Sequence, residues 1–159
     1  MIRRANFEDL PAIKELIQQY IQDFVVSEQG KEKFNEDYLN HVMNQSDIHF
    51  YVYEYHSKII GFISYTDAVH IMHFFVDQMY KGMSVGKQLW RYVLDLLCEH
   101  YSLEKEIKIT VNSSLYAVPV YKKFGFEERS DVCEKEGIRF VKMDLSYGID
   151  HKKAPEGAF

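Results

Sequence analysis

The apolar positions of the first 45 residues recur with the spacing of amphipathic helices. Asn6, with Asp9 three residues later, is typical of a helix cap, and apolar side chains then follow at every third or fourth position up to Phe24. This pattern predicts one long first helix. A break at residues 28–30 separates it from a second helix, predicted at about residues 31–45.

The middle of the chain changes to a pattern typical of β-strands. Segments 49–56 and 59–67 are rich in aromatic and β-branched residues. They are separated only by Ser57-Lys58, which predicts a hairpin. Residues 69–76 continue the pattern as a third strand.

The second half of the chain alternates helical and strand patterns. Helical spacing predicts a helix from residue 84 to about 101 and a shorter one at 115–124, closed by Gly125. Segments 106–111 and 139–145 have the composition of strands. A strand, a crossover helix and a further strand in this order favour a parallel pair in the sheet.

The chain of 159 residues is long enough to build one hydrophobic core. Its hydrophobic content of 47% and aromatic content of 15% exceed those of a disordered segment. We therefore expect a single domain at residues 1–147. Residues 148–159 show no periodicity, which predicts a flexible C-terminal tail.

Charge and cysteine content limit the partners and the compartment. A formal net charge of −5 argues against nucleic acid, whose phosphates need a concentrated basic face. Cys98 and Cys133 are too few for a disulfide framework and lack the spacing of metal ligands, which favours a reducing compartment and no metal site. No secretory signal and no run of roughly twenty apolar residues is found, so we expect a cytoplasmic protein without a membrane partner.

Residues 76–87 join the third predicted strand to the long helix that follows it. The first N–H groups of a helix have no partner within it, and its dipole adds about half a positive charge, so this turn can hold a phosphate or pyrophosphate. Gly82 and Gly86 let the main chain approach an oxygen closely, and the Ser84 hydroxyl can cap the helix or bind a phosphate oxygen. The two glycines are equally well explained if the segment forms only a tight turn and binds no ligand.

A second motif follows the next predicted strand. Asn112 is followed by Ala117, Tyr121 and the pair Gly125-Phe126. Each residue alone has an ordinary alternative, which is a cap for Asn112, a core position for Tyr121 and a helix stop for Gly125. Their joint spacing behind a phosphate loop resembles the GNAT superfamily of N-acetyltransferases.

The resemblance covers residues 1–145 and implies both the fold and the cosubstrate. It implies an α/β (α+β) fold with a central, mixed and largely antiparallel sheet, splayed between its fourth and fifth strands and flanked by about four helices. It also implies acetyl-CoA, held by its pyrophosphate at the loop, where Lys81 replaces the family's Gln or Arg and Ser84 replaces a Gly. The positions that the resemblance assigns to acetyl-CoA binding are Phe75, Val76, Lys81, Gly82, Met83, Ser84, Val85, Gly86, Lys87, Asn112, Ala117 and Tyr121.

The resemblance further implies direct acetyl transfer to a primary amine through a tetrahedral intermediate. An alkylammonium has a pKa of about 10.4, so its proton must leave, and His70 stands at the strand position of the family's base. His73 ranks second, because strand alternation places it on the opposite face unless a bulge intervenes. The Val76 backbone N–H is the implied donor to the carbonyl oxygen, and Tyr121 is the implied acid for the leaving thiolate. Packing in a strand or on the surface is the ordinary alternative for either histidine.

From the sequence, the acceptor amine is either a small molecule or a peptide. The resemblance implies that residues 22–40 and 131–139 surround the acceptor. The acidic residues that either attract a cationic amine or form the solvated face of a helix are Glu28, Glu32, Glu36 and Asp37. A non-catalytic acyl-CoA sensor or interaction module with the same fold is the alternative function, and a homodimer is compatible with the resemblance.

Overall fold

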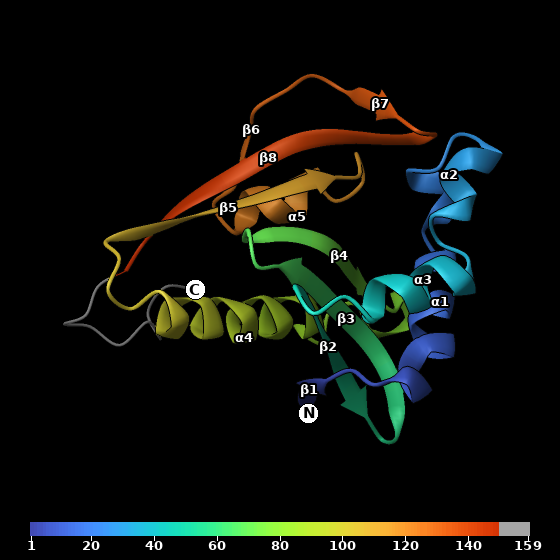
Figure 1. Ribbon diagram of the computed structural model, residues 1–159, viewed down its shortest axis with the longest axis horizontal. Coiled ribbons are helices and arrows are strands. Elements are labelled where there is room, and N and C mark those ends of the chain that lie inside the picture. Colours follow the sequence, from blue (N-terminus) through green and yellow to red (C-terminus); the bar gives the residue numbers. More distant parts are fainter. Residues whose placement is uncertain (150–159) are drawn as a thin grey trace.

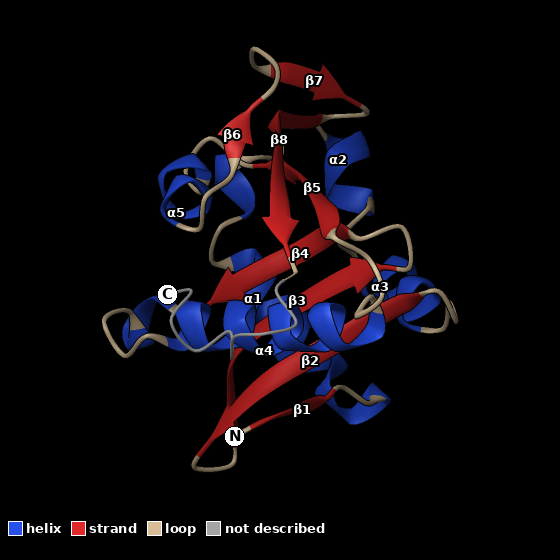
Figure 2. Cartoon of the chain, turned by 90° about the vertical axis from the view of Figure 1, so that its left-hand side faces the viewer, coloured by secondary structure: helices blue, strands red, loops and turns tan. Residues whose placement is uncertain are grey.

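The computed structural model describes residues 1–149 and shows a central β-sheet with helices on both faces (Figures 1 and 2). The strands are β1 (Ile2–Arg4), β2 (Ile48–Tyr55), β3 (Lys58–Thr66), β4 (His70–Val76), β5 (Glu106–Ser113), β6 (Glu127–Glu128), β7 (Cys133–Lys135) and β8 (Ile138–Gly148). The α-helices are α1 (Leu10–Gln18), α2 (Glu28–Glu32), α3 (Glu36–Met43), α4 (Val85–His100) and α5 (Val118–Lys123). The described part of the chain thus has five α-helices, against about four expected.

The strands are ordered β1-β2-β3-β4-β5-β8-β6, and β7 pairs with β8 outside this path. The named strand pairs are antiparallel except β4 with β5, whose register joins only His70 to Thr110 and Ile71 to Val111. Beyond these residues the two strands separate toward their C-terminal ends (Figure 1). This confirms the mixed sheet that opens between its fourth and fifth strands, and the parallel pair expected there.

Two hydrophobic clusters lie on opposite faces of the sheet. One contains Leu89 and Trp90 of α4, and the other contains Ile13 of α1 and Leu39 of α3. Figure 2 shows α4 in front of β2 and β3, with α1 behind the sheet. Each helix buries the apolar stripe that its 3.6-residue spacing creates. None of the helices in residues 1–149 is long and apolar enough to cross a membrane.

The first helix is shorter than its apolar pattern predicts, because α1 ends at Gln18. Farther along, the Val26 N–H donates to the Gly137 carbonyl at 2.8 Å, and the Phe24 carbonyl accepts from the Arg139 N–H at 2.8 Å. The prediction of one helix up to residue 24 was wrong, because the 3-10 helix Ile21–Asp23 follows α1, and Phe24 and Val26 then form backbone hydrogen bonds with Arg139 and Gly137. Local spacing carries no information about this distant partner.

The break expected between the first two helices was also wrong. Its residues belong to α2, whose N-cap is Ser27. A Cβ on Gly30 would lie 2.2 Å from the Gly137 carbonyl oxygen. Gly30 therefore allows α2 to touch the turn between β7 and β8, and it does not end a helix.

The last part of the described chain holds three strands where one was predicted. β8 extends to Gly148, and both β6 and β7 pair with it. β6 and β7 have two and three residues, which is too short for a period-2 pattern to be read. Residues 150–159, which include most of the predicted tail, lie outside the described residues.

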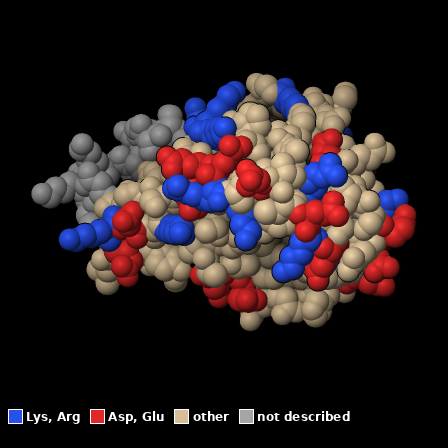
Figure 3. Space-filling model, turned by 90° about the horizontal axis from the view of Figure 1, so that it is seen from above, with Lys and Arg blue, Asp and Glu red and all other residues tan. Residues whose placement is uncertain are grey.

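Acidic and basic side chains are interspersed on the face seen from above in Figure 3. Ion pairs along the last strands follow this pattern. Arg129 lies 2.8 Å from both Asp144 and Glu127, and Lys122 lies 3.5 Å from Glu128. This face therefore carries charge of both signs.

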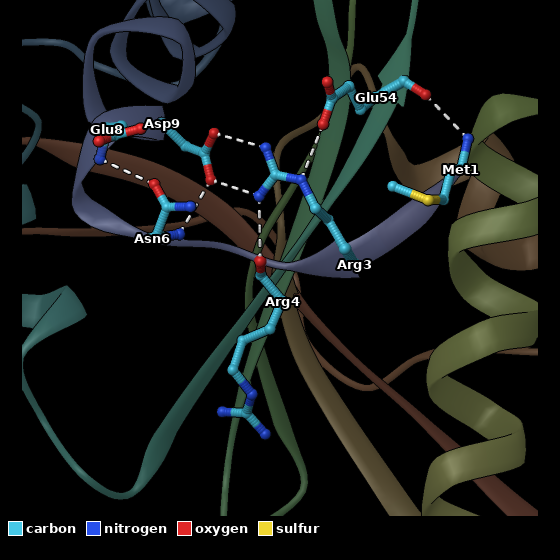
Figure 4. A network of polar contacts seen from close by, with 7 residues as sticks. All are labelled: Met1, Arg3, Arg4, Asn6, Glu8, Asp9 and Glu54. Carbon is cyan, nitrogen blue, oxygen red and sulfur yellow. Dashed lines mark hydrogen bonds and ion pairs between the residues drawn. The ribbon is translucent and has the colours of Figure 1, made fainter. Parts of the chain in front are cut away.

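Arg3 joins β1 to the first helical turn and to β2 (Figure 4). Its guanidinium donates to both carboxylate oxygens of Asp9, at 2.8 and 2.9 Å, and to Glu54 at 2.8 Å. Asp9 also accepts the Asn6 N–H at 2.8 Å, and Asn6 accepts the Glu8 N–H at 2.9 Å. These contacts confirm the cap predicted from Asn6 and Asp9.

We expect Asp9→Asn to lower the free energy of unfolding by about 2 kcal/mol at neutral pH, because it weakens a bidentate ion pair of a buried carboxylate. Arg3 holds the Asp9 pKa below its usual value. Such a lowered pKa contributes stability above the unfolded pKa of about 3.9, and the contribution is lost as the pH falls through the folded value. Urea unfolding below about pH 4 should therefore be less pH-dependent in the variant. Glu8→Gln, at an exposed position, is the control, and an unchanged pH dependence in Asp9→Asn would contradict this role.

Candidate active site

The turn between β4 and α4 presents backbone N–H groups without protein acceptors. Within residues 1–149, this is true of Gly82, Ser84, Val85, Gly86 and Lys87. The Met83 N–H makes one long hydrogen bond of 3.4 Å to the Tyr80 carbonyl. Together with the positive end of the α4 dipole, these groups form a site for an anion.

Ser84 is the N-cap of α4 and adopts a left-handed backbone conformation, with φ 60° and ψ 25°. For a residue other than glycine this conformation is unfavourable by about 1 to 2 kcal/mol. The Ser84 side chain makes no capping hydrogen bond. Of its two expected roles, helix capping is therefore wrong, and contact with a phosphate oxygen stays a prediction.

A cavity of about 450 Å³ extends from this turn to the gap between β4 and β5. We call it the cofactor cavity, and its lining residues are Tyr20, Phe74, Phe75, Val76, Tyr80, Lys81, Gly82, Ser84, Val85, Gly86, Ser114, Tyr116, Ala117, Val120 and Tyr121. The structure thus brings together nine of the twelve positions predicted for acetyl-CoA. Met83 and Lys87 are exposed beside the turn, and Asn112 lines a different cavity.

Tyr20 and Tyr116 also line the cofactor cavity, although sequence reasoning missed them. The Lys81 ammonium contacts the Tyr116 hydroxyl and lies 4.6 and 5.5 Å from the centres of the Tyr116 and Tyr20 rings. The three residues come from the end of α1, the β4–α4 turn and the segment after β5. No spacing in the sequence distinguishes these two among twelve tyrosines.

The Val76 backbone points into the gap between β4 and β5. The Asp77 N–H donates to the Ile60 carbonyl at 2.8 Å, so Val76, which faces Gly61, is the neighbouring non-hydrogen-bonded position of the ladder. Its N–H and carbonyl therefore both point away from β3. The carbonyl accepts from the Tyr20 hydroxyl at 2.6 Å, which fixes this end of the strand.

A second cavity of about 330 Å³ lies between α2–α3, β4, β5 and the β7–β8 hairpin. We call it the acceptor cavity. It shares five lining residues with the cofactor cavity, namely Phe74, Phe75, Ser114, Ala117 and Tyr121. A group bound in one cavity therefore meets a group bound in the other at this boundary.

Tyr121 lies at the boundary of the two cavities and is only 5% exposed. Its ring packs edge-on against Phe74 and Phe126. Burial raises the pKa of its hydroxyl far above the ordinary value of about 10. The hydroxyl is therefore protonated at neutral pH and available as a hydrogen-bond donor.

His70 lines the acceptor cavity where the start of β4 pairs with the middle of β5. Its Nδ1 lies 2.7 Å from the Thr110 hydroxyl. Burial lowers the His70 pKa below the ordinary value of 6.5. The imidazole is therefore neutral at pH 7 and able to accept a proton.

His73 lines the same cavity as His70, because the bulge that was named as the exception to strand alternation is present. The register between β3 and β4 shifts after the pair of Ser64 and His73, leaving Met72 as a bulge. A bulge adds one residue and reverses the alternation of faces beyond it. Ring contacts with Phe50 and with aromatic neighbours show that His73 packs into the cluster on the α1 face.

The surroundings of His73 are those of a packing residue. Its Nδ1 lies 2.6 Å from the hydroxyl of Ser64, and its side chain is buried. Burial lowers the His73 pKa to about 4. Such a buried imidazole is a weak base, and the choice of His70 as the base, with His73 ranked second, stays a prediction.

Both segments expected to frame the acceptor line the acceptor cavity. Val25, before α2, forms a β-bridge to Ile138, and the ammonium of Lys33, just after α2, lies 2.5 Å from Glu136, so the residues on either side of α2 contact the β7–β8 hairpin. The four acidic residues proposed to attract a cationic amine are exposed and do not line it: Glu28, Glu32, Glu36 and Asp37. The structure agrees better with the alternative, in which these four residues form a solvent-exposed helix face.

Comparison with known proteins gives the family. Residues 18–147 match the model of the acetyltransferase (GNAT) domain, so the chain belongs to this family, as its two motifs indicated. The chain is 24% identical over 84 residues to the spermine/spermidine N(1)-acetyltransferase of Bacillus subtilis (strain 168). That match covers 46% of this chain and 55% of the relative, so the chain spans about half the length of the curated relatives it matches.

Solved structures share the fold over nearly the whole chain. The PaiA N-acetyltransferase from Thermoplasma acidophilum, in complex with coenzyme A, has a TM-score of 0.68 at 20% identity and covers 92% of this chain and 98% of its own. A GCN5-related N-acetyltransferase from Rhodopseudomonas palustris has a TM-score of 0.72 at 18% identity, with 93% and 94% covered. At these identities the likeness establishes the fold.

Proposed function

We propose that this protein is an N-acetyltransferase that moves an acetyl group from acetyl-CoA to a primary amine. The observation that carries the proposal is the set of free N–H groups at the start of α4, beside a cavity that meets a second cavity at Tyr121. Membership of the GNAT family supports it. The coenzyme A in the Thermoplasma relative supports the choice of cosubstrate.

The residues of the cofactor cavity fit a diphosphate and an extended acyl arm. The free amides between Gly82 and Lys87 match the charge of a pyrophosphate, and Lys81 adds a cation beside them. The gap between β4 and β5 then accommodates the arm that carries the thioester, whose carbonyl oxygen would accept the Val76 N–H. Ser84 and Lys81 replace residues of the family pattern without removing these N–H groups.

The proposed reaction proceeds by direct attack of the amine. The ammonium first loses a proton to His70, directly or through a water. The nitrogen then bonds to the thioester carbon, and charge on the oxygen is stabilised by Val76 N–H. The carbon–sulfur bond breaks as the carbonyl re-forms, and the departing thiolate accepts a hydrogen bond from Tyr121. Because the raised pKa of Tyr121 disfavours complete proton transfer to a thiolate, the proton that neutralises the sulfur comes ultimately from the amine.

Calorimetry with acetyl-CoA, followed by a thiol-release assay over polyamines, aminoglycosides, amino acids and peptide N-termini, tests the proposal. We expect acetyl-CoA to bind and free thiol to appear with at least one amine. Binding without thiol release from any amine would instead favour the non-catalytic acyl-CoA sensor, and the absence of binding would reject both functions. A cytoplasmic location and a homodimer stay predictions.

His70→Gln should remove the acid limb from the pH profile of kcat/KM and lower kcat by about 10²-fold at neutral pH. Since burial lowers the His70 pKa, the wild-type protein should keep its activity to below pH 6.5 and lose it as the pH falls through that lowered value. His41→Gln, at an exposed position on α3, is the matched control. An acid limb that persists in His70→Gln would assign the base to another group.

A further inference from the structure

We propose that the acceptor is an amine that also carries a carboxylate and an apolar body, such as an amino acid with a large apolar side chain. This inference rests on the proposed acetyltransferase function and specifies its substrate class. It follows from the charged residues that line the acceptor cavity and from the apolar wall within it.

The charged residues that line the acceptor cavity are predominantly basic. They are Lys33, Lys135, Arg139 and the acidic Glu136. A polyamine carries several positive charges and needs carboxylates that are free to pair with them. The lining offers one carboxylate to three cations, so the cavity repels a polycation and attracts an anionic group.

The single carboxylate is already compensated within the protein. The Lys33 ammonium lies 2.5 Å from Glu136 Oε2, and Lys135 also acts on the same carboxyl. Both lysines hold the Glu136 pKa below its ordinary value, Lys33 more strongly. A cationic acceptor would have to replace these contacts, whereas an anionic one adds to them.

Lys135 is the cation best placed to receive a carboxylate. It faces Ile138 across the β7–β8 ladder, on the side of the hairpin that includes buried Phe140. Among the ion pairs within residues 1–149, none involves Lys135, whereas Lys33 pairs with Glu136 and Arg139 lies 3.9 Å from Glu134. A new partner for Lys135 therefore breaks no existing ion pair in the described part of the chain.

One wall of the acceptor cavity is apolar, and Asn112, Ser113 and Ser114 elsewhere in the lining are polar but uncharged. Its apolar wall is formed by Phe24, Phe34, Met72, Phe74, Phe75, Ile138 and Phe140. The two histidines in the lining have lowered pKa values and are neutral at pH 7, so they add no charge. Such a wall gains free energy by burying an apolar side chain, at about 25 cal/mol per Å² of buried surface.

Matched pairs of acceptors test the inference. Phenylalanine, leucine and methionine are compared by thiol release with phenethylamine, isoamylamine and 3-methylthiopropylamine, which lack only the carboxylate, and with spermidine. We expect kcat/KM for each amino acid to exceed that for its decarboxylated partner by at least about tenfold, the effect of one charge-assisted contact. Higher kcat/KM for spermidine or for the simple amines would overturn the inference and leave the acetyltransferase function intact.

Lys135→Glu provides the second arm. The variant should lower kcat/KM for the amino acids by at least about tenfold, mainly through KM, and raise the values for the simple amines, because a carboxylate at position 135 attracts their positive charge. Lys105→Glu makes the same charge change at an exposed residue that lines neither cavity. Equal effects of the two variants, or an unchanged preference in Lys135→Glu, would overturn the inference. If no amine releases thiol from a protein that binds acetyl-CoA, the proposed function itself fails.

Discussion

Replacing Gly86 by aspartate is expected to raise the Kd for acetyl-CoA more than about 100-fold while the protein stays folded. Gly86 lies in the first turn of α4, beside the N–H groups that would hold the pyrophosphate. Two like charges about 4 Å apart near a protein surface repel by about 4 kcal/mol. Calorimetry with acetyl-CoA measures the loss.

The same substitution should not harm the fold. A Cβ at Gly86 would lie 3.5 Å from the nearest atom of Val76, which is an ordinary contact. A carboxylate in the first turn of a helix is also stabilising by a few tenths of a kcal/mol. Gly86→Asn, which has the same shape without the charge, is the matched control, and both variants should match the wild-type Tm. Wild-type affinity in Gly86→Asp would refute the anion site at α4.

Replacing Tyr121 by phenylalanine should lower kcat by about 10²-fold with an acceptor that the protein turns over, and change the Kd for acetyl-CoA less than about threefold. The substitution removes one hydroxyl at the boundary of the two cavities and keeps the ring contacts with Phe74 and Phe126. The lost hydrogen bond is needed chiefly when the sulfur becomes charged, so the effect falls on turnover.

Tyr147→Phe is the control for this experiment, because Tyr147 lies on β8 and lines neither cavity. It should leave kcat unchanged. Unchanged kcat in Tyr121→Phe would remove Tyr121 from the reaction and leave it as a core residue. A parallel rise in the Kd for acetyl-CoA would instead indicate a binding role.

Much of the fold follows from local patterns. The hairpin of β2 and β3, the strand β4, the long helix α4 and the parallel arrangement of β4 and β5 all match the predicted order of elements. Strands of seven to nine residues and a helix of sixteen are long enough to show their own periodicity. The short strands β6 and β7 are not, and they depend on β8 for their pairing.

The candidate site is predictable where its residues follow one another in the chain. The turn from Lys81 to Gly86 and the motif from Asn112 to Phe126 are continuous, and the structure places most residues of the turn, with Ala117 and Tyr121 of the motif, around one cavity. Tyr20 and Tyr116 join the same cavity from the ends of α1 and β5. Their contact with Lys81 depends on how three elements pack.

By itself, the sequence determined the order of the main elements, the glycine turn before α4 and the position of Tyr121, because these depend on neighbours within one turn or strand. The tertiary structure alone decided three features. The bulge at Met72, formed against the neighbouring strand β3, turned His73 to the side of His70. The segment after α1 forms backbone hydrogen bonds with Gly137 and Arg139, and Gly30 packs against Gly137. Pairing between neighbouring strands and contacts between segments about a hundred residues apart both override local preference, and they leave no periodic trace in the sequence.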